Sequence, residues 1–324
     1  MLSAFIPQSH GLARTEIPAG GAIPADAIWL DLLEPTPAEE KQIESFLAID
    51  VPTRDEMREI EASNRLYEED GTLYMTATVV TKLDSDLPES TQITFILSAA
   101  KLVTNRYVDP LPFRRFVAYA DRHPHSCNSP PAVLAGLLEA VVNRVADVIE
   151  RAAMDLDGAS AEVFSASRRR RGVMRDFRLV LERLGQNGEL ISKARESLVS
   201  LGRLLTFVQQ STSVPMSGEV RARFRTLTRD VMAMSDHASF LGTKVSFILD
   251  ATLGLINIDQ NNILKIFSVV TVFLLPPSVI GAIYGMNFEH LPGARESWGF
   301  WGALGLMLLS AIGPFLYFKR KGWL

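Results

Sequence analysis

Two uncharged, strongly apolar segments near the C-terminal end constrain the fold of this chain more than any other feature. They cover residues 266–284 and 298–318, and neither contains a charged side chain. A helix over the first segment would be roughly 28 Å long, close to the hydrocarbon thickness of a bilayer. Because the core helix of a soluble protein seldom needs such a length, we expect a membrane hairpin of two spans.

The charges beside the two spans predict their orientation. Lys265 precedes the first span and a Lys-Arg-Lys run at 319–321 follows the second, whereas the loop between them carries two glutamates and one arginine. The positive-inside rule therefore predicts both termini in the cytoplasm and the loop outside. Residues 1–7 include no basic segment followed by a long apolar run, so we expect no signal peptide and a cytosolic location for everything before the hairpin.

The chain before the hairpin divides into two regions of different pattern. Residues 1–131 mix strand and helix patterns and predict a cytoplasmic α/β domain, residues 132–265 predict long helices and a stalk, and residues 266–324 form the hairpin. Strand patterns lie at 28–32, 73–81, 92–97 and 102–107, and the last two should pair as a hairpin. Thr36 and Glu39 have the form of a capping box that opens a helix, and Thr53 with Glu56 predicts a second helix start.

The helical region should contain three long helices, the last of which is the most informative. We expect a break near residues 185–188, where two glycines stand, a turn at 211–218, and a third helix from about Glu219. Apolar positions in this helix follow alternating steps of four and three, which is typical of a heptad seam. They are Val220, Phe224, Leu227, Val231, Met234, Ala238, Leu241, Val245, Ile248, Thr252 and Leu255. We expect the helix to continue into the first span, with a bend near Gly254 as the alternative.

A second stripe on the same helix is polar. Between residues 266 and 283 the only hydroxyl or amide side chains are Ser268, Thr271 and Ser278, and all three fall on one helical face. The full stripe comprises Asp250, Gly254, Asn257, Asn261, Leu264, Ser268, Thr271, Leu275, Ser278, Ala282 and Gly285. Since lipid-facing positions avoid polar groups, this face should meet protein or water, and a pore shared by several chains is one interpretation. Hydroxyls that bond back to their own helix are the other.

Composition excludes several classes of protein. The net charge is −4, with no basic excess that would indicate nucleic acid as a partner, and the single cysteine excludes an intrachain disulfide. We find no phosphate-binding Gly-x-x-x-x-Gly-Lys loop and no Ser/His/Asp or Cys/His constellation. We therefore expect neither an enzyme nor an organic cofactor.

The outer end of the first span resembles a known family signature. The sequence there is Tyr284-Gly285-Met286-Asn287-Phe288-Glu289, and the chain ends in Tyr317-Phe318-Lys319-Arg320-Lys321-Gly322-Trp323-Leu324. Both stretches resemble the CorA family of magnesium transporters of the Gly-Met-Asn type, and similarity extends to residues 256–261, 266–270 and 1–5. Leu291-Pro292-Gly293 departs from the Met-Pro-Glu that the family often has, so we expect no cation-gathering role for position 293.

The resemblance implies a homopentameric funnel in the bacterial inner membrane. Gly285, Met286 and Asn287 would form the selectivity filter at the outer mouth, with Glu289 in the adjoining loop. The first spans would line the pore through Asn261, Leu264, Ser268, Thr271, Leu275 and Ser278. Mg²⁺, and also Co²⁺ and Ni²⁺, would pass hydrated, driven by the membrane potential, and cytosolic Mg²⁺ bound between subunits would close the pore.

The carboxylates that would bind regulatory Mg²⁺ are harder to assign from sequence. Candidates are Glu68, Glu69, Asp70, Asp230 and Asp250, because divalent sites need clustered oxygens. Most acidic runs are merely solvated, and this interpretation stays open for each. Two other functions also stay open: a zinc transporter of the ZntB-like branch, which usually carries Gly-Ile-Asn in place of Gly285-Met286-Asn287, and a membrane-anchored scaffold without ion flux.

Overall fold

The computed structural model describes residues 1–8, 11–59, 61–81, 88–165, 177–286, 296 and 298–322. It separates into two compact units, Met1–Leu249 and Asp250–Leu324. The finer division at residues 131 and 265 stays a prediction.

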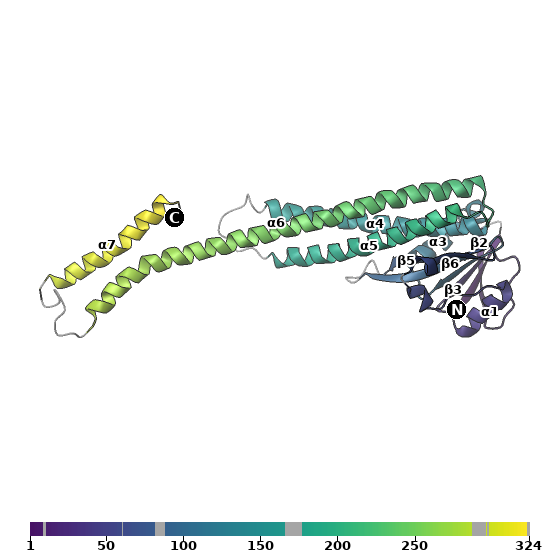
Figure 1. Cartoon of the computed structure of the whole chain (residues 1–324), viewed down its shortest axis with the longest axis horizontal. Helices are drawn as coiled ribbons and strands as arrows, with labels where there is room; N and C mark the ends of the chain where they lie inside the picture. The colour runs from purple at the N-terminus through teal and green to yellow at the C-terminus, as the bar shows by residue number, and fades with distance from the viewer. Residues whose placement is uncertain are drawn as a thin grey trace. The chain divides into compact units, whose positions relative to one another are not determined.

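The first unit is built on a mixed seven-stranded sheet with the order β2-β1-β3-β7-β6-β5-β4 (Figure 1). The strands are β1 Leu2–Gln8, β2 Gly11–Ile17, β3 Trp29–Leu33, β4 Leu66–Glu69, β5 Thr72–Thr81, β6 Glu89–Leu97 and β7 Leu102–Arg106. Neighbouring strands are antiparallel, except that β3 runs parallel to β7. The predicted α/β domain and the predicted β6–β7 hairpin are confirmed.

Helices cover both faces of this sheet. On one face α1, Pro37–Leu47, buries Ile43 against Leu30 and Leu32. On the other lie α3, Leu111–Ala120, and the long helices α4, Pro130–Ser165, and α5, Arg178–Gln210 (Figure 1). Side chains at alternate strand positions point to opposite faces, so each strand supplies both apolar layers.

The two predicted helix starts have different outcomes. At Thr36 both halves of the capping box form, and α1 follows as expected. At Thr53 the reciprocal hydrogen bonds with Glu56 also form, but only a 3₁₀ turn follows, η1 at Glu56–Arg58, so a second full helix there was wrong. Met57 is the only buried residue of that turn, and a single apolar contact does not offset the cost of starting a helix.

The predicted break near residues 185–188 is also wrong. Gly185 and Gly188 lie inside α5, and the connection between the two long helices falls instead between Ser165 and Arg178. A glycine costs a helix only about 1 kcal/mol, which packing can outweigh. Near Gly188, a Cβ would lie 3.5 Å from Val245 Cγ1, so the absence of a side chain leaves room for a neighbouring helix.

The third long helix, α6, extends without interruption from Gly218 to Tyr284. Phe224, Ala238, Ile248 and Thr252 of the predicted heptad seam are completely buried, and the remaining members are buried or half-buried. The seam and the continuous helix are confirmed. Most stabilisation of such a helix comes from this buried seam, since isolated helices are marginal in water.

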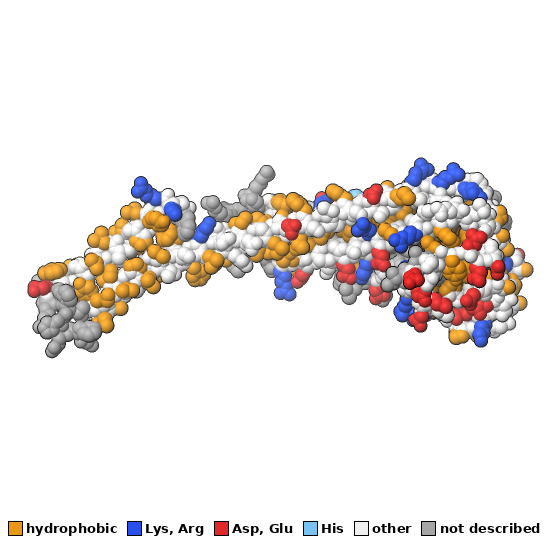
Figure 2. All heavy atoms as spheres, in the orientation of Figure 1, with side chains coloured by type: hydrophobic (Ala, Val, Ile, Leu, Met, Phe, Trp, Pro, Cys, Tyr) orange, Lys and Arg blue, Asp and Glu red, His pale blue; other side chains and the backbone are white. Residues whose placement is uncertain are grey.

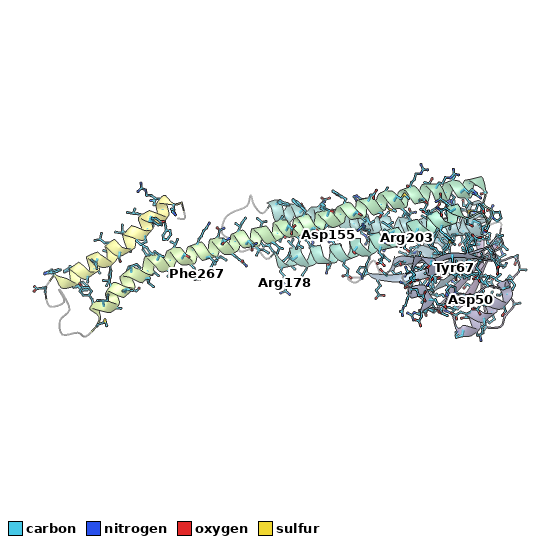
Figure 3. All side chains as sticks on the ribbon, viewed as in Figure 1. Asp50, Tyr67, Asp155, Arg178, Arg203 and Phe267 are labelled. Atoms are coloured by element: carbon cyan, nitrogen blue, oxygen red, sulfur yellow. The ribbon has the colours of Figure 1, made fainter. Side chains whose placement is uncertain are left out.

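The second unit contains the end of α6 and helix α7, Gly299–Arg320. In the described residues these two helices are long and apolar enough to cross a membrane, and almost none of their apolar surface is buried within the chain. Figure 2 shows hydrophobic side chains along this hairpin, whereas charged side chains gather on the first unit. Phe267, labelled in Figure 3, is 68% exposed, which suits contact with lipid or another chain.

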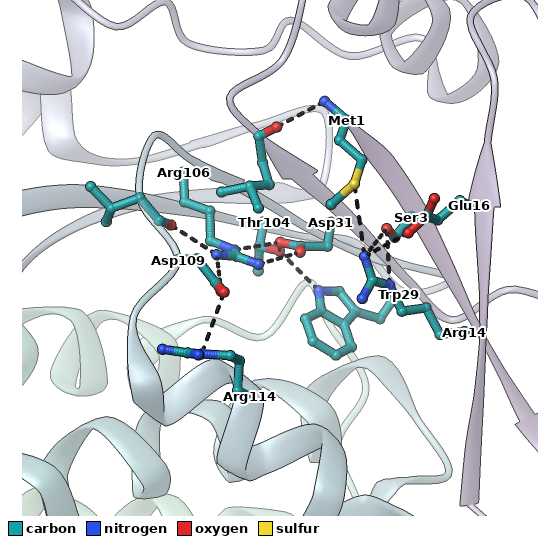
Figure 4. Close-up of polar contacts among 12 residues, drawn as sticks. Met1, Ser3, Arg14, Glu16, Trp29, Asp31, Thr104, Arg106, Asp109 and Arg114 are labelled. Atoms are coloured by element: carbon teal, nitrogen blue, oxygen red, sulfur yellow. Dashed lines mark hydrogen bonds and ion pairs between the residues drawn. The ribbon is translucent and has the colours of Figure 1, made fainter.

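A buried ion pair lies inside the sheet of the first unit (Figure 4). Asp31 on β3 accepts two hydrogen bonds from the Arg106 guanidinium on β7 and a third from Thr104 Oγ1 at 2.6 Å. Burial by itself would lower the pKa of Arg106, but the hydrogen bonds and charges of Asp31 and Asp109 outweigh it and raise that pKa. Arg106 therefore stays charged, and each of its partners is fixed in place.

Candidate functional site

One face of the first span packs against the second span. The half-buried positions of this part of α6 recur at helical spacing and so share a face. They are Val269, Pro276, Pro277, Ile280 and Gly281. At Gly281 a Cβ would lie 3.3 Å from Met307 Cε of α7, so the absence of a side chain admits this contact. The hairpin is thus held together along one side of α6 only.

The polar stripe lies on the opposite face of α6. At about 100° per residue, its positions are centred roughly half a turn away from the α7 contact. Every member of the stripe is exposed in the single chain, including the predicted pore positions Asn261, Leu264, Ser268, Thr271, Leu275 and Ser278. Leu264 and Leu275 are 63% and 60% exposed. One chain therefore leaves this face open for water or for other chains.

Two of the stripe's hydroxyls bond back to their own helix. Ser268 Oγ donates to Leu264 O at 2.8 Å, and Ser278 Oγ donates to Leu274 O at 2.7 Å. This back-bonding satisfies the donor of each hydroxyl, while the oxygen keeps free lone pairs. Such a face presents acceptors, which suit the hydrogens of water molecules around a cation.

Pro276 and Pro277 lie inside the same part of α6. Because proline has no N–H, the carbonyl groups of Val272 and Phe273 lack their usual helical donors. Unpaired carbonyls inside a membrane are tolerated where protein or water satisfies them. Two further acceptors are therefore available within the span.

The outer end of the span carries the first two positions of the predicted filter. The Gly285 amide donates to Gly281 O at 2.9 Å, and the Met286 amide donates to Ile283 O at 3.2 Å, so both residues continue the last turn of α6. A Cβ at position 285 would lie 3.1 Å from Gly281 O. That oxygen belongs to the preceding turn of the same helix. Asn287 and Glu289 lie outside the described residues.

Sequence reasoning missed the role of Gly281 in the contact between the spans. Gly281 lies off the polar stripe, and small residues within a span are typical of close helix approach in membranes. This glycine was visible in the sequence and could have indicated the face that meets α7.

The candidate regulatory carboxylates do not meet within one chain. Glu68 and Glu69 end β4, and Asp70 adopts a left-handed conformation in the turn to β5. Asp230 and Asp250 are both exposed, Asp230 in the first unit and Asp250 at the start of the second. Among the described residues, no group of three or more potential metal ligands comes together.

The surroundings of Glu68 and Asp230 are nevertheless polar. Glu68 accepts hydrogen bonds from Ser211 Oγ, at 3.3 Å, and from Ser213 Oγ, both in the turn between α5 and α6. Asp230 lines a groove beside Arg223, whose guanidinium forms a two-pronged ion pair with Glu139 at 2.8 and 3.0 Å. This hydrogen bonding raises the pKa of Arg223. Arg223 therefore stays charged and paired with Glu139, and the exposed Asp230 can face solvent or another chain.

The fold and the site together define a membrane protein with two spans, one of which keeps a polar face open. Comparison with known proteins identifies the family: residues 24–320 match the profile described as CorA-like Mg²⁺ transporter protein. This chain belongs to the CorA family.

Individual relatives agree over the whole length. The magnesium transport proteins CorA of Yersinia pseudotuberculosis and of Escherichia coli K12 are each 32% identical to it over 324 residues, covering 100% of both chains. The structure of the CorA magnesium transporter from Methanocaldococcus jannaschii covers 100% of this chain and 99% of its own, with a TM-score of 0.77 at 19% identity. At this identity the likeness shows that the two chains share a fold. The resemblance drawn from the Gly-Met-Asn motif is confirmed, and CorA proteins are transporters and not enzymes.

Proposed function

We propose that this protein is a Mg²⁺ channel whose pore is shared among identical subunits, each contributing the open polar face of α6. The carrying observation is the placement of that stripe opposite the α7 contact, where a single chain leaves it exposed. Two spans are too few to enclose a pore, so several chains must surround a common axis. Five is the number that the family resemblance implies.

The filter of this channel is Gly285, Met286 and Asn287, with Glu289 in the loop beyond. Mg²⁺ gives up its waters reluctantly, and a ring of neutral amide oxygens binds the hydrated ion without removing them. A carboxylate ring would hold a divalent ion more tightly and slow its release. The same filter would admit hydrated Co²⁺ and Ni²⁺.

Below the filter, Leu264 and Leu275 form apolar constrictions that close by excluding water, while Asn261 lies toward the cytoplasmic entrance. Two positive charges moving inward through 100 mV gain about 4.6 kcal/mol, so the membrane potential suffices to drive uptake. The protein lies in the bacterial inner membrane with both termini in the cytoplasm, as the flanking charges predict.

Regulation would come from cytosolic Mg²⁺ bound between subunits. Because Glu68, Glu69, Asp70, Asp230 and Asp250 do not cluster in one chain, a site built from them needs oxygens from two chains. Bound Mg²⁺ would stabilise the closed pore. When cytosolic Mg²⁺ is low, the ion would dissociate and the pore could open.

The test is Mg²⁺ uptake into vesicles that contain the full chain or its Asn287→Ala variant. We expect the variant to lose uptake while the oligomer remains intact by cross-linking. Asn262→Ala is the matched control, since Asn262 lies on the same helix but off the stripe. Normal Mg²⁺ uptake by Asn287→Ala would refute the filter.

The same vesicles separate magnesium from zinc transport. Cobalt hexaammine imitates hydrated Mg²⁺, and we expect it to compete with uptake. Zn²⁺ uptake that is insensitive to this competitor would favour the ZntB-like alternative, and absence of any cation flux would favour a scaffold.

A further inference from the structure

A cavity of about 500 Å³ lies between strands β4 and β5 and helix α5 in the first unit, and arginines dominate its charge. Arg65, Arg195 and Arg203 line it, against one carboxylate, Glu196. Arg203 is labelled on α5 in Figure 3. The volume of the cavity falls within the range of small-molecule sites. The cavity therefore has the size and the positive charge to hold a small anion.

The two arginines from α5 are not used in the fold. Arg195 and Arg203 are exposed, and neither forms an ion pair within the described part of the chain. Two other arginines of the long helices do form ion pairs: Arg183 pairs with Asp155, and Arg223 pairs with Glu139. Free guanidinium groups at a cavity wall offer paired donors that match phosphate oxygens.

Arg65 enters the cavity from the sheet side and is fixed in position. Its Nη1 donates to Thr78 Oγ1 at 3.2 Å, and its Nε donates to the carbonyl oxygen of Glu59. A guanidinium held in this way keeps its remaining donors oriented, which lowers the entropy cost of binding a ligand. Arg65 thus supplies a rigid positive wall opposite the two arginines of α5.

The floor of the cavity is polar, although it lies where a helix packs on a sheet. Hydroxyls line it from both sides: Thr76, Thr78, Ser192 and Ser200. The Thr78 amide donates to Ser200 Oγ at 2.9 Å, and Thr76 Oγ1 lies 2.8 Å from Thr94 Oγ1. Packing alone would favour apolar side chains here, whereas hydroxyls can donate to anion oxygens.

The number of arginines favours an anion with several oxygens. Arg195 and Arg203 share one face of α5 and stand roughly 12 Å apart along its axis. Two or three linked phosphates offer enough oxygens to contact both of these arginines and Arg65 at once. An adjoining groove of about 510 Å³ shares Leu66, Val199 and Arg203 with the cavity and continues over apolar side chains. A ligand with an apolar end could extend into that groove.

We propose that this cavity binds a small anion with two or more linked phosphate groups. The phosphates lie against Arg65, Arg195 and Arg203, and the apolar end of the ligand, where it has one, occupies the adjoining groove. Inorganic tripolyphosphate and a nucleoside triphosphate share this chemistry, and they differ in whether they can use the groove.

The experiment measures binding of both compounds to the purified full chain in lipid nanodiscs, with EDTA in every sample so that chelation of Mg²⁺ is equal throughout. We expect the Arg195→Gln/Arg203→Gln variant to bind at least about tenfold more weakly than wild type, because two charge-assisted contacts are lost. Arg221→Gln/Arg225→Gln is the matched control: it removes two exposed arginines from α6 outside the cavity, and should bind like wild type. Tighter binding of the nucleotide than of tripolyphosphate supports a role for the groove, and equal affinity excludes that role.

A conservative pair of substitutions guards against a folding defect. Arg195→Lys/Arg203→Lys keeps both charges but loses the planar fork, so we expect a severalfold loss of affinity with an unchanged unfolding temperature. No binding by wild type, or equal losses in the cavity variant and the control, would overturn the proposal. So would dissociation of the oligomer by the cavity variant without any binding by wild type, since the arginines would then join copies of the chain. Binding is measured apart from transport, so neither result bears on the channel itself.

Discussion

The Arg106 guanidinium meets both carboxylate oxygens of Asp31 in the interior of the sheet, with Nη2 at 2.7 Å from Oδ2 and Nε at 2.9 Å from Oδ1. The two side chains are only 6% and 5% exposed, and they join the parallel neighbours β3 and β7. Without Asp31 the buried Arg106 charge keeps only Asp109, which is 41% exposed, and removing one partner of a buried pair costs far more than the pair itself contributes.

We therefore expect Asp31→Asn to lower the free energy of unfolding by about 3–5 kcal/mol. Asp157→Asn is the control, because Asp157 is 73% exposed in its ion pair with Lys244 and should cost at most about 1 kcal/mol. Chemical unfolding of the detergent-solubilised protein measures both values. Similar losses in the two variants would show that burial does not govern the Asp31 pair.

The seam of α6 predicts a second contrast, between two phenylalanines on one helix. Phe224 is completely buried and Phe240 is 61% exposed. We expect Phe224→Ala to cost about 3–5 kcal/mol, since it removes buried apolar surface and leaves a cavity. Phe240→Ala should cost about 1 kcal/mol or less. The same unfolding measurement compares them, and a larger effect at Phe240 would place the buried side of α6 elsewhere.

The contact between α4 and α5 should respond to acid. Hydrogen bonding from Arg183, at 2.5 Å, is the main cause that lowers the pKa of Asp155 from its ordinary value of 3.8, with Asn187 adding to it. A lowered folded-state pKa stabilises the protein above the ordinary value, and this stabilisation disappears as pH falls through the folded-state pKa.

The stability difference between wild type and Asp155→Asn should therefore be largest near neutral pH. We expect it to narrow between about pH 4 and pH 2, when unfolding temperatures of the two proteins are compared. A difference that is independent of pH would mean that packing, and not the charge of Asp155, supports this contact.

The open stripe predicts how uptake depends on the face of α6. Thr271→Leu adds apolar bulk on the stripe and should reduce Mg²⁺ uptake severalfold, because it narrows and dries the proposed pore. Val270→Leu adds bulk one position away, off the stripe, and should leave uptake near wild type. If Val270→Leu were the more damaging substitution, the pore would lie on another face.

Features that depend on neighbours in the sequence could be predicted. The Thr36 capping box needs only four consecutive residues, and the α6 seam needs only helical spacing, so both follow from pattern. Tertiary context decided the failures. Gly185 and Gly188 remain helical because α5 packs along its length, and η1 stops after Arg58 for want of buried contacts.

Only the part of the candidate site that lies on a single helix could be predicted from the sequence. The stripe follows from one helix, so its face could be assigned before its exposure was known. The arginine cavity could not be predicted, since Arg65 and Arg195 are 130 positions apart and meet only because α5 packs on β5. The regulatory carboxylates pose the same difficulty between chains, because their partners would belong to another subunit.

The continuity of α6 limits how this chain can change in length. One residue inserted between Asn261 and Ser268 would rotate everything beyond it by about 100° and advance it by about 1.5 Å. Ser268 and Thr271 would then leave the side of the helix that Asn257 and Asn261 occupy. Steps of about seven or eleven residues restore the angular phase to within roughly 20°. Insertions and deletions in this stretch are therefore constrained by rotation and not by bulk.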